Sequence, residues 1–246
     1  MHLHIAELIR AQAAENGRLA SILSASWPAF YLGSVAPDCQ EVAHISREQT
    51  HFYDVPPEPE NLAYPRMLAQ YPQLADGPGL PPAQALFVAA YSVHLLYDLI
   101  WFRDVLLPYF VNAGQWVDGL KERVMVHHVV LTYLDKLAYE SLPETAVSTL
   151  SAAQPDHWLP FISDEALCQW QHQLTAQLEP TGELETINVY AGRLGITPVE
   201  FAANLDDTEW MEAHVFRNVP VGAIQQKLET AVTDSIALIC QYLHID

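Results

Sequence analysis

The sequence predicts an all-α protein, and three observations support this. The stretch 83–110 is the most apolar run in the chain, and its apolar residues recur at one, three and four positions, as in a helix buried on most sides. Proline and glycine are dense at about 31–82, which excludes long helices and central strands there. No segment sustains the apolar–polar alternation of a half-buried strand. We therefore expect a multi-helix bundle with a long irregular stretch at about 31–82.

The other elements are predicted from apolar spacing and from capping signals. A first helix is expected over residues 3–25, ended by Pro28. After the central run, residues 115–139 are expected to form an amphipathic helix. The sequence Thr197-Pro198-Val199-Glu200 is typical of a helix start, with a threonine cap, a proline at the first position and a glutamate at the third. Further helices are expected over 163–178, 183–194 and 222–243.

The chain offers one candidate division, near 142–162, where Leu142-Pro143 interrupts the helical pattern. Its 246 residues, half of them hydrophobic, are enough for an ample core. We expect an N-terminal half, 1–142, that carries the candidate ligand residues described below, and a helical C-terminal half, 143–246. We expect the two halves to pack into one domain.

The net charge of −19 restricts the possible partners. Binding to duplex nucleic acid requires a basic surface, so this class of partner is not expected. The acidic surface would also repel a phosphate-bearing substrate unless the site itself carried positive charge. A bound metal would supply such charge.

The expected location is cytoplasmic. The N-terminus lacks a basic region followed by an apolar core, so no secretory signal is visible. Cys39, Cys168 and Cys240 are few and widely spaced, which is typical of reduced thiols. The run 83–110 is long enough to cross a bilayer, but no basic cluster flanks it and no transmembrane segment is expected. The run also contains His94, Asp98, Arg103 and Asp104, which are unusual in a membrane-spanning helix.

His94 and Asp98 lie four residues apart within this apolar run, so they project from one helical face, one turn apart. A buried, ionised carboxylate is costly unless it is paired or binds a metal. A single histidine on an apolar face is more often a hydrogen-bonded core residue, so the pair alone leaves both interpretations open. Other segments supply further candidates of the residue types that suit zinc: His2, His4, Asp38 and His51.

In their order along the chain, these residues resemble the zinc-dependent phospholipase C family. Its all-α fold is shared by bacterial phospholipases C, single-strand-specific nucleases and the N-terminal domain of glycosylphosphatidylinositol phospholipase D. The resemblance covers about residues 1–140 and implies a phospholipase C/nuclease-like bundle. The matching pieces are His2-Leu-His4-Ile-Ala, Leu32-Gly-Ser-Val-Ala-Pro-Asp38, Thr50-His51-Phe52 and His94-Leu-Leu-Tyr-Asp98.

The resemblance implies a role for each matched residue. Asp38 would bind one metal and contact the nucleophilic water, which makes it the candidate catalytic residue. His51 and His94 would be ligands of the same metal. Asp98 would bridge to a second metal, held also by His2, with His4 as the less favoured alternative. We expect the stretch that carries Asp38 and His51 to fold back over the central helix.

The chain also departs from the family pattern. The secreted enzymes use the terminal amine of a tryptophan as a ligand, whereas this chain begins at Met1. The histidine that holds a third metal is replaced by Asp104, and His127 and His128 lack the carboxylate four residues later. Two interpretations of these residues are open. Asp104, His127 and His128 could form a weaker metal site, or Asp104 could be a solvated aspartate and the two histidines a core or surface pair. We expect one tightly held Zn²⁺, a second held more weakly, and no tight third.

These observations favour a zinc-dependent hydrolase that attacks a phosphoric ester with a metal-activated water. The substrate would be a phospholipid head group, a nucleotide or a small soluble phosphodiester. Two alternatives remain: a non-catalytic metal-binding or interaction protein with a partial site, and a helical protein whose His and Asp residues coincide by chance. Arg47 would steer a phosphate, fix a ligand or form a surface ion pair.

Overall fold

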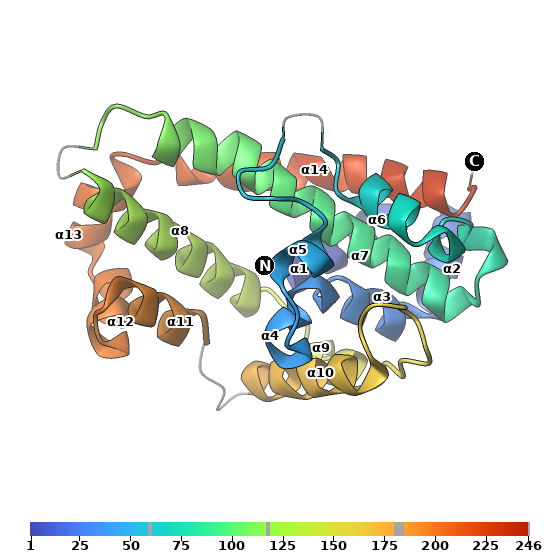
Figure 1. Ribbon diagram of the computed structural model, residues 1–246. Coiled ribbons are helices and arrows are strands. Elements are labelled where there is room, and N and C mark those ends of the chain that lie inside the picture. Colours follow the sequence, from blue (N-terminus) through green and yellow to red (C-terminus); the bar gives the residue numbers. More distant parts are fainter. Residues whose placement is uncertain (59–60, 117–118, 180–184, 246) are drawn as a thin grey trace.

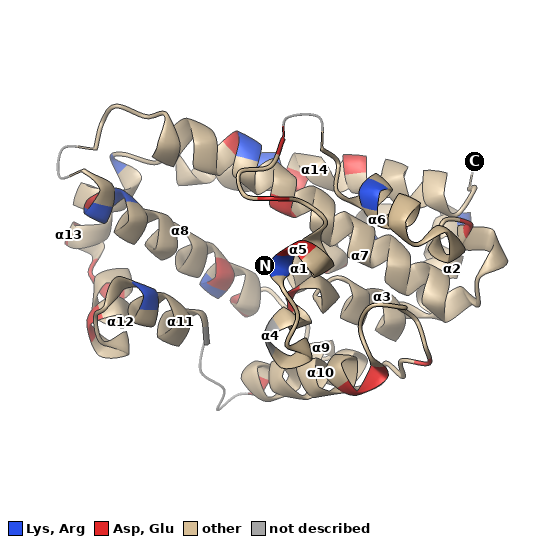
Figure 2. Cartoon of the chain, viewed as in Figure 1, with Lys and Arg blue, Asp and Glu red and all other residues tan. Residues whose placement is uncertain are grey.

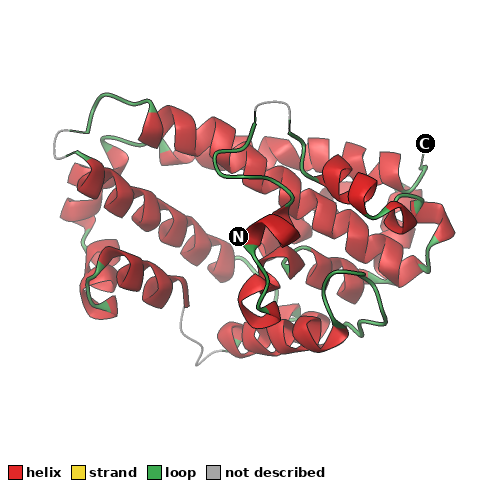
Figure 3. Cartoon of the chain, viewed as in Figure 1, coloured by secondary structure: helices red, strands yellow, loops and turns green. Residues whose placement is uncertain are grey.

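The computed structural model describes residues 1–58, 61–116, 119–179 and 185–245. Over these ranges the chain forms helices joined by loops and turns, and it forms no strand (Figure 3). The predicted all-α class is therefore confirmed.

The longest helical unit is α7 (Pro82–Trp101), which continues directly into the π-helical segment η4 (Phe102–Val111). Together they match the helix predicted for 83–110. By length and composition Pro82–Val111 could cross a membrane, and 78% of its most apolar window is buried inside the structure. In Figure 1, α7 and the last helix, α14 (Val221–Tyr242), lie side by side and pack together.

A close helix contact fixes the position of the chain before Asp38. Helix α3 (Trp27–Gly33) packs along α7, and Gly33 lies directly on the α7 backbone. A Cβ atom at Gly33 would lie 2.3 Å from the carbonyl oxygen of Phe87, so only glycine fits without a shift of one helix. The contact brings Ser34, the residue after the helix, against the face of α7 that carries His94.

The stretch predicted to be irregular, at about 31–82, contains several short helices, so the expectation of irregular structure was too strong. Proline at the first turn allows a helix to begin, while the next proline prevents it from growing long. The prediction that no long helix forms here is correct. The elements are η1 (Ala36–Cys39), α4 (Gln40–Ala43), α5 (Arg47–His51), α6 (Tyr64–Gln70), η2 (Pro72–Leu74) and η3 (Gly77–Gly79).

The helix predicted for 3–25 is divided into α1 (His2–Ala13) and α2 (Gly17–Ala25), so the prediction of one continuous helix was wrong. The side chain of Asn16 accepts a hydrogen bond from the Leu19 amide and caps a new helix. This cap competes with continuation of α1 through Gly17, which has a poor helix propensity.

Helix α8 belongs to the N-terminal half and begins at Leu120 rather than at the predicted residue 115. The C-terminal half supplies the remaining helices, and those that were predicted agree with the expected bounds to within a few residues. Thr197 and Glu200 form the predicted capping box. The predicted start of the helix at 183 lies outside the described residues. The elements are α8 (Leu120–Glu140), α9 (Ala146–Ser151), α10 (Asp164–Leu178), α11 (Glu185–Leu194), α12 (Pro198–Asp206), α13 (Thr208–Trp210), η5 (Met211–Phe216) and α14.

The two halves share one buried apolar cluster, which runs from Leu3 to Ile245. Helix α14 packs against α1 and α7, and α9 packs against α3. Helix α10 packs against η1 and α4, and Figure 1 shows it running below α4. The C-terminal helices therefore support the segments that carry Asp38 and His2.

Candidate metal centre

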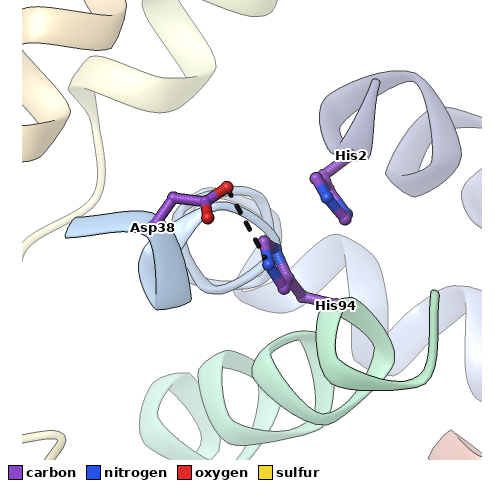
Figure 4. A group of neighbouring side chains, drawn as sticks. All are labelled: His2, Asp38 and His94. Atoms are coloured by element: carbon purple, nitrogen blue, oxygen red, sulfur yellow. Dashed lines mark ion pairs between the residues drawn. The ribbon is translucent and has the colours of Figure 1, made fainter. Parts of the chain in front are cut away.

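Four separate elements converge on one point beside α7. His94 and Asp98 project from α7, Asp38 lies in η1, His51 is the last residue of α5, and His2 is the first residue of α1. Figure 4 shows His2, Asp38 and His94 with their side chains directed toward one another. The stretch with Asp38 and His51 thus folds back over the central helix.

The local backbone aims the His51 side chain. Helix α5 begins with a capping box between Ser46 and Gln49 and ends because Phe52 adopts a left-handed conformation, with φ of 57°. This conformation is unusual for a bulky residue and costs free energy. The turn places the whole His51 side chain in the interior, with no exposed surface.

The distances between these side chains are longer than hydrogen bonds. His51 Nε2 lies 3.4 Å from Asp38 Oδ1 and 3.4 Å from Asp98 Oδ2. His94 Nε2 lies 3.8 Å from Asp38 Oδ2 and 3.8 Å from Asp98 Oδ1. Two ligands that are each about 2 Å from a tetrahedral zinc are about 3.3 Å apart. Each of these His–Asp distances therefore exceeds the spacing of two ligands of one ion by at most a few tenths of an ångström.

The two buried imidazoles have unsatisfied nitrogens. Among the described residues, Nε2 of His51 and Nε2 of His94 have no hydrogen-bond partner. A buried polar atom without a partner costs about 1–3 kcal/mol. Two groups of side chains have ligand atoms close enough to hold a metal: His2, Asp38 and His94, and His51, His94 and Asp98. The residues present therefore fit a divalent cation.

The other nitrogen of each imidazole is held by a neighbour. Nδ1 of His94 lies 2.9 Å from the carbonyl oxygen of Ser34, which can only accept, so Nδ1 carries the proton. Nδ1 of His51 lies 2.8 Å from the Thr50 hydroxyl, which donates to the Arg47 carbonyl oxygen at 3.2 Å and is free to accept from His51. The neutral His94 ring then presents an unprotonated Nε2 to the carboxylates, as metal ligation requires.

His2 and His4 have different surroundings. The His2 ring stacks on the His94 ring, with centroids 3.7 Å apart, and its Nε2 lies 3.7 Å from Asp98 Oδ1. The His4 ring lies instead beside Ser141, with Nδ1 2.7 Å from the hydroxyl oxygen. The structure thus brings His2, and not His4, to the cluster.

The electrostatics of the cluster favour a cation. Burial lowers the pKa of His2 to about 3 and also lowers the pKa of His94, so both rings are neutral near pH 7. Burial raises the pKa values of Asp38 and Asp98, but the neighbouring imidazoles, His94 first, lower them by more. Arg47 also lowers the pKa of Asp98. Both pKa values therefore lie below the ordinary range for a carboxyl group. Two negative carboxylates therefore face unprotonated nitrogens.

Arg47 and Tyr53 complete the cluster. Arg47 Nη2 donates to Asp98 Oδ2 and, at 2.8 Å, to the Tyr53 hydroxyl. The Tyr53 hydroxyl donates to the same Asp98 oxygen at 3.0 Å. Sequence reasoning missed Tyr53, although it follows His51 by two residues. A tyrosine among other aromatics carries no signal that separates a site residue from a core residue.

The three weaker candidates lie apart from the cluster. The Asp104 carboxylate lies 3.2 Å from the Lys227 ammonium group. His127 Nε2 accepts a hydrogen bond from the Trp101 indole at 3.2 Å. His128 stacks on Tyr190, with ring centroids 4.4 Å apart. Nδ1 of His128 has no hydrogen-bond partner among the described residues, but none of the three residues belongs to a metal-capable group there.

The cluster opens into a cavity of about 780 Å³. His2, Asp38 and Arg47 lie at one side of it, and α8, α10 and α11 supply the opposite walls. Its aromatic lining residues are Tyr139, Trp170 and Tyr190. The volume is that of a small-molecule site and far exceeds the volume of one phosphoryl group. Any ligand at the cluster would therefore have room for a sizeable organic part.

Comparisons of the chain with protein-family models, with curated proteins and with solved structures gave no match.

Proposed function

We propose that this protein is a divalent-metal-dependent hydrolase of phosphoric esters, with a phospholipase C/nuclease-like site and zinc as the ion. The observation that carries the proposal is the pair of buried, unpartnered imidazole nitrogens beside two carboxylates. These nitrogens and the adjoining cavity support a bound ion with one coordination position open to a ligand in the cavity. His51, His94, Asp38 and Asp98 would hold the ion, and His2 would share a second, weaker one with Asp98.

The charges of the site support an anionic substrate. Asp38 and Asp98 contribute two negative charges, and Arg47 contributes one positive charge. A divalent cation would change this sum from −1 to +1, within a chain of net charge −19. A phosphoryl group would then be attracted to this site, although the chain carries 30 Asp and Glu residues against 11 Lys and Arg residues (Figure 2).

Asp38 is the carboxylate best suited to act on water. Its side chain is 39% exposed and lines the cavity, whereas that of Asp98 is 17% exposed. Its low pKa keeps it ionised, so it can orient a water molecule or accept its proton. The bound ion would lower the pKa of that water and offset charge on the phosphoryl oxygens.

The proposal is tested with bis(4-nitrophenyl) phosphate, a general phosphodiester that needs no specific head group. Zinc-loaded protein should hydrolyse it, and chelator-stripped protein should not. Asp38→Asn should lower kcat by at least about a hundredfold, the usual contribution of a positioned base. Asp54→Asn is the matched control, because Asp54 is 77% exposed and pairs with Arg66. Equal, zinc-independent rates for all three proteins would contradict the proposal.

A second candidate is a metal-binding protein without turnover. It is favoured by the contact of Arg47 with Asp98, the carboxylate that a second metal would have to share. Bound zinc without phosphodiesterase activity would support this candidate. Whether phosphate binds the zinc-loaded protein would then decide whether an anion is still its ligand.

A further inference from the structure

Arg47 lies between the two carboxylates of the cluster. Its Nη2 donates to Asp98 Oδ2, and its Nη1 lies 3.8 Å from Asp38 Oδ1. Tyr53 holds the guanidinium through its hydroxyl at 2.8 Å and through its ring, whose centroid is 5.7 Å from Cζ. One fixed positive charge therefore contacts both acidic residues.

The contacts of Arg47 and Tyr53 fill one oxygen of Asp98. A carboxylate oxygen has two lone-pair positions, and Oδ2 accepts from Arg47 Nη2 and from the Tyr53 hydroxyl. A carboxylate that bridges two metals gives one oxygen to each of them. With Oδ2 occupied, only Oδ1 remains, and this oxygen faces both His2 and His94 at 3.7 and 3.8 Å.

Arg47 also reaches the ligand space. Its side chain is 37% exposed, and it lines the cavity beside Asp38 and His2. A guanidinium has five N–H donors in one plane, and its contacts with Asp98 and Tyr53 engage one terminal nitrogen. Donors on the other side are available for two oxygens of a phosphoryl group, a geometry that guanidinium matches well.

We propose that Arg47 takes the place of a second tightly bound metal, so that one ion and one guanidinium together bind the phosphoryl group of the substrate. This inference rests on the proposed function for the identity of the ligand. It follows that Arg47 weakens binding of a second ion, because the two compete for Asp98, and that it strengthens binding of phosphate.

Zinc and inorganic phosphate are the probes for this inference, and both are followed by titration calorimetry. Wild-type protein, stripped with chelator, should bind one zinc tightly and a second at least tenfold more weakly. In Arg47→Gln the second zinc should bind at least tenfold more tightly than in the wild type. Protein loaded with one zinc should bind phosphate at least tenfold more weakly when it carries Arg47→Gln.

Two further variants separate this role from a structural one. Arg47→Lys keeps the charge without the planar donors, so it should restore part of the phosphate affinity. Arg18→Gln removes an exposed arginine on α2, outside the cluster, and it should change neither titration. Thermal melting of each variant reports whether it is folded.

A second zinc that binds equally in wild type and Arg47→Gln would overturn the inference, as would phosphate affinity that does not depend on Arg47. These outcomes are distinct from failure of the proposed function, which is read from hydrolysis of bis(4-nitrophenyl) phosphate. If hydrolysis is absent but both titrations change as expected, Arg47 is the anion contact of a non-catalytic site.

Discussion

Replacement of His94 with glutamine, measured with and without zinc, separates a metal centre from a core that happens to contain histidine. Binding stabilises the folded state by an amount set by the ratio of free zinc to its dissociation constant. At a thousandfold excess over that constant, the wild type should gain about 4 kcal/mol. For a chain of this size, this corresponds to a rise in Tm of about 8–16 °C.

Glutamine removes one of the four donors around the candidate ion. Loss of an outer-shell partner alone weakens a metal site by about 10- to 100-fold, so loss of a direct ligand is expected to cost about a thousandfold. At the same free zinc, the gain in stability then falls to about 0.4 kcal/mol, or about 1–2 °C in Tm. Without zinc the variant also loses the buried hydrogen bond from His94 Nδ1 to the Ser34 carbonyl oxygen, so the zinc-dependent rise in Tm of each protein is measured against its own stripped form.

The assay is thermal unfolding of stripped and zinc-loaded protein, followed by circular dichroism. His172→Gln is the matched control, because His172 is exposed on α10 and lies outside the cluster. It should keep the full rise in Tm. If zinc raised the Tm of His94→Gln as much as that of the wild type, the metal assignment of His94 would be refuted.

Three other predictions test neighbouring parts of the argument. His2→Ala should weaken the second zinc equivalent in a titration while His4→Ala leaves it unchanged; the opposite result would transfer the role to His4. Gly33→Ala should destabilise the protein by about 1–3 kcal/mol in urea unfolding and weaken zinc binding, because α3 must move off α7. Gly192→Ala, with open space around its Cβ, should instead stabilise the protein by about 0.4–1 kcal/mol. Burial lowers the pKa of His127 to about 3 in the folded protein. As pH falls, the unfolded chain therefore binds a proton at this residue before the folded chain does. The stability that neutral His127 contributes is lost as pH falls from about 6.5 toward 3. At pH 5 the loss is about 2 kcal/mol, and His127→Gln should remove that part of the pH dependence.

The fold class could be predicted because the helices have strong local signals. The apolar run of α7 and the capping box at Thr197 are both visible as short patterns, and both are found where expected. The first helix was predicted wrongly because its break depends on one side chain, that of Asn16, which bonds to the Leu19 amide. Asparagine occurs in helices and at caps, so sequence alone does not distinguish the two.

The residues of the cluster and the return of the Asp38–His51 stretch over the central helix could be predicted, but not the contacts that fix their positions. His2, Asp38, His51 and His94 come from four elements, and their convergence depends on the contact of Gly33 with α7 and on the left-handed turn at Phe52. Neither feature can be predicted from the sequence. Glycine occurs in many turns as well as at close helix contacts, and phenylalanine so rarely adopts a positive φ that one would not expect it here. Tyr53 and the contact of Arg47 with both carboxylates depend on the same turn.

The cost of this arrangement argues against coincidence. Two buried imidazole nitrogens have no partner among the described residues, and two ionised carboxylates share the same interior with them. Arg47 offsets only one of the two negative charges. Other buried atoms without a partner, such as His128 Nδ1, stand away from ionised carboxylates, and each unmet group costs about 1–3 kcal/mol. A divalent ion would satisfy all of them at once, so the metal-free cluster is expected to lower the stability of the protein and the loaded one to raise it.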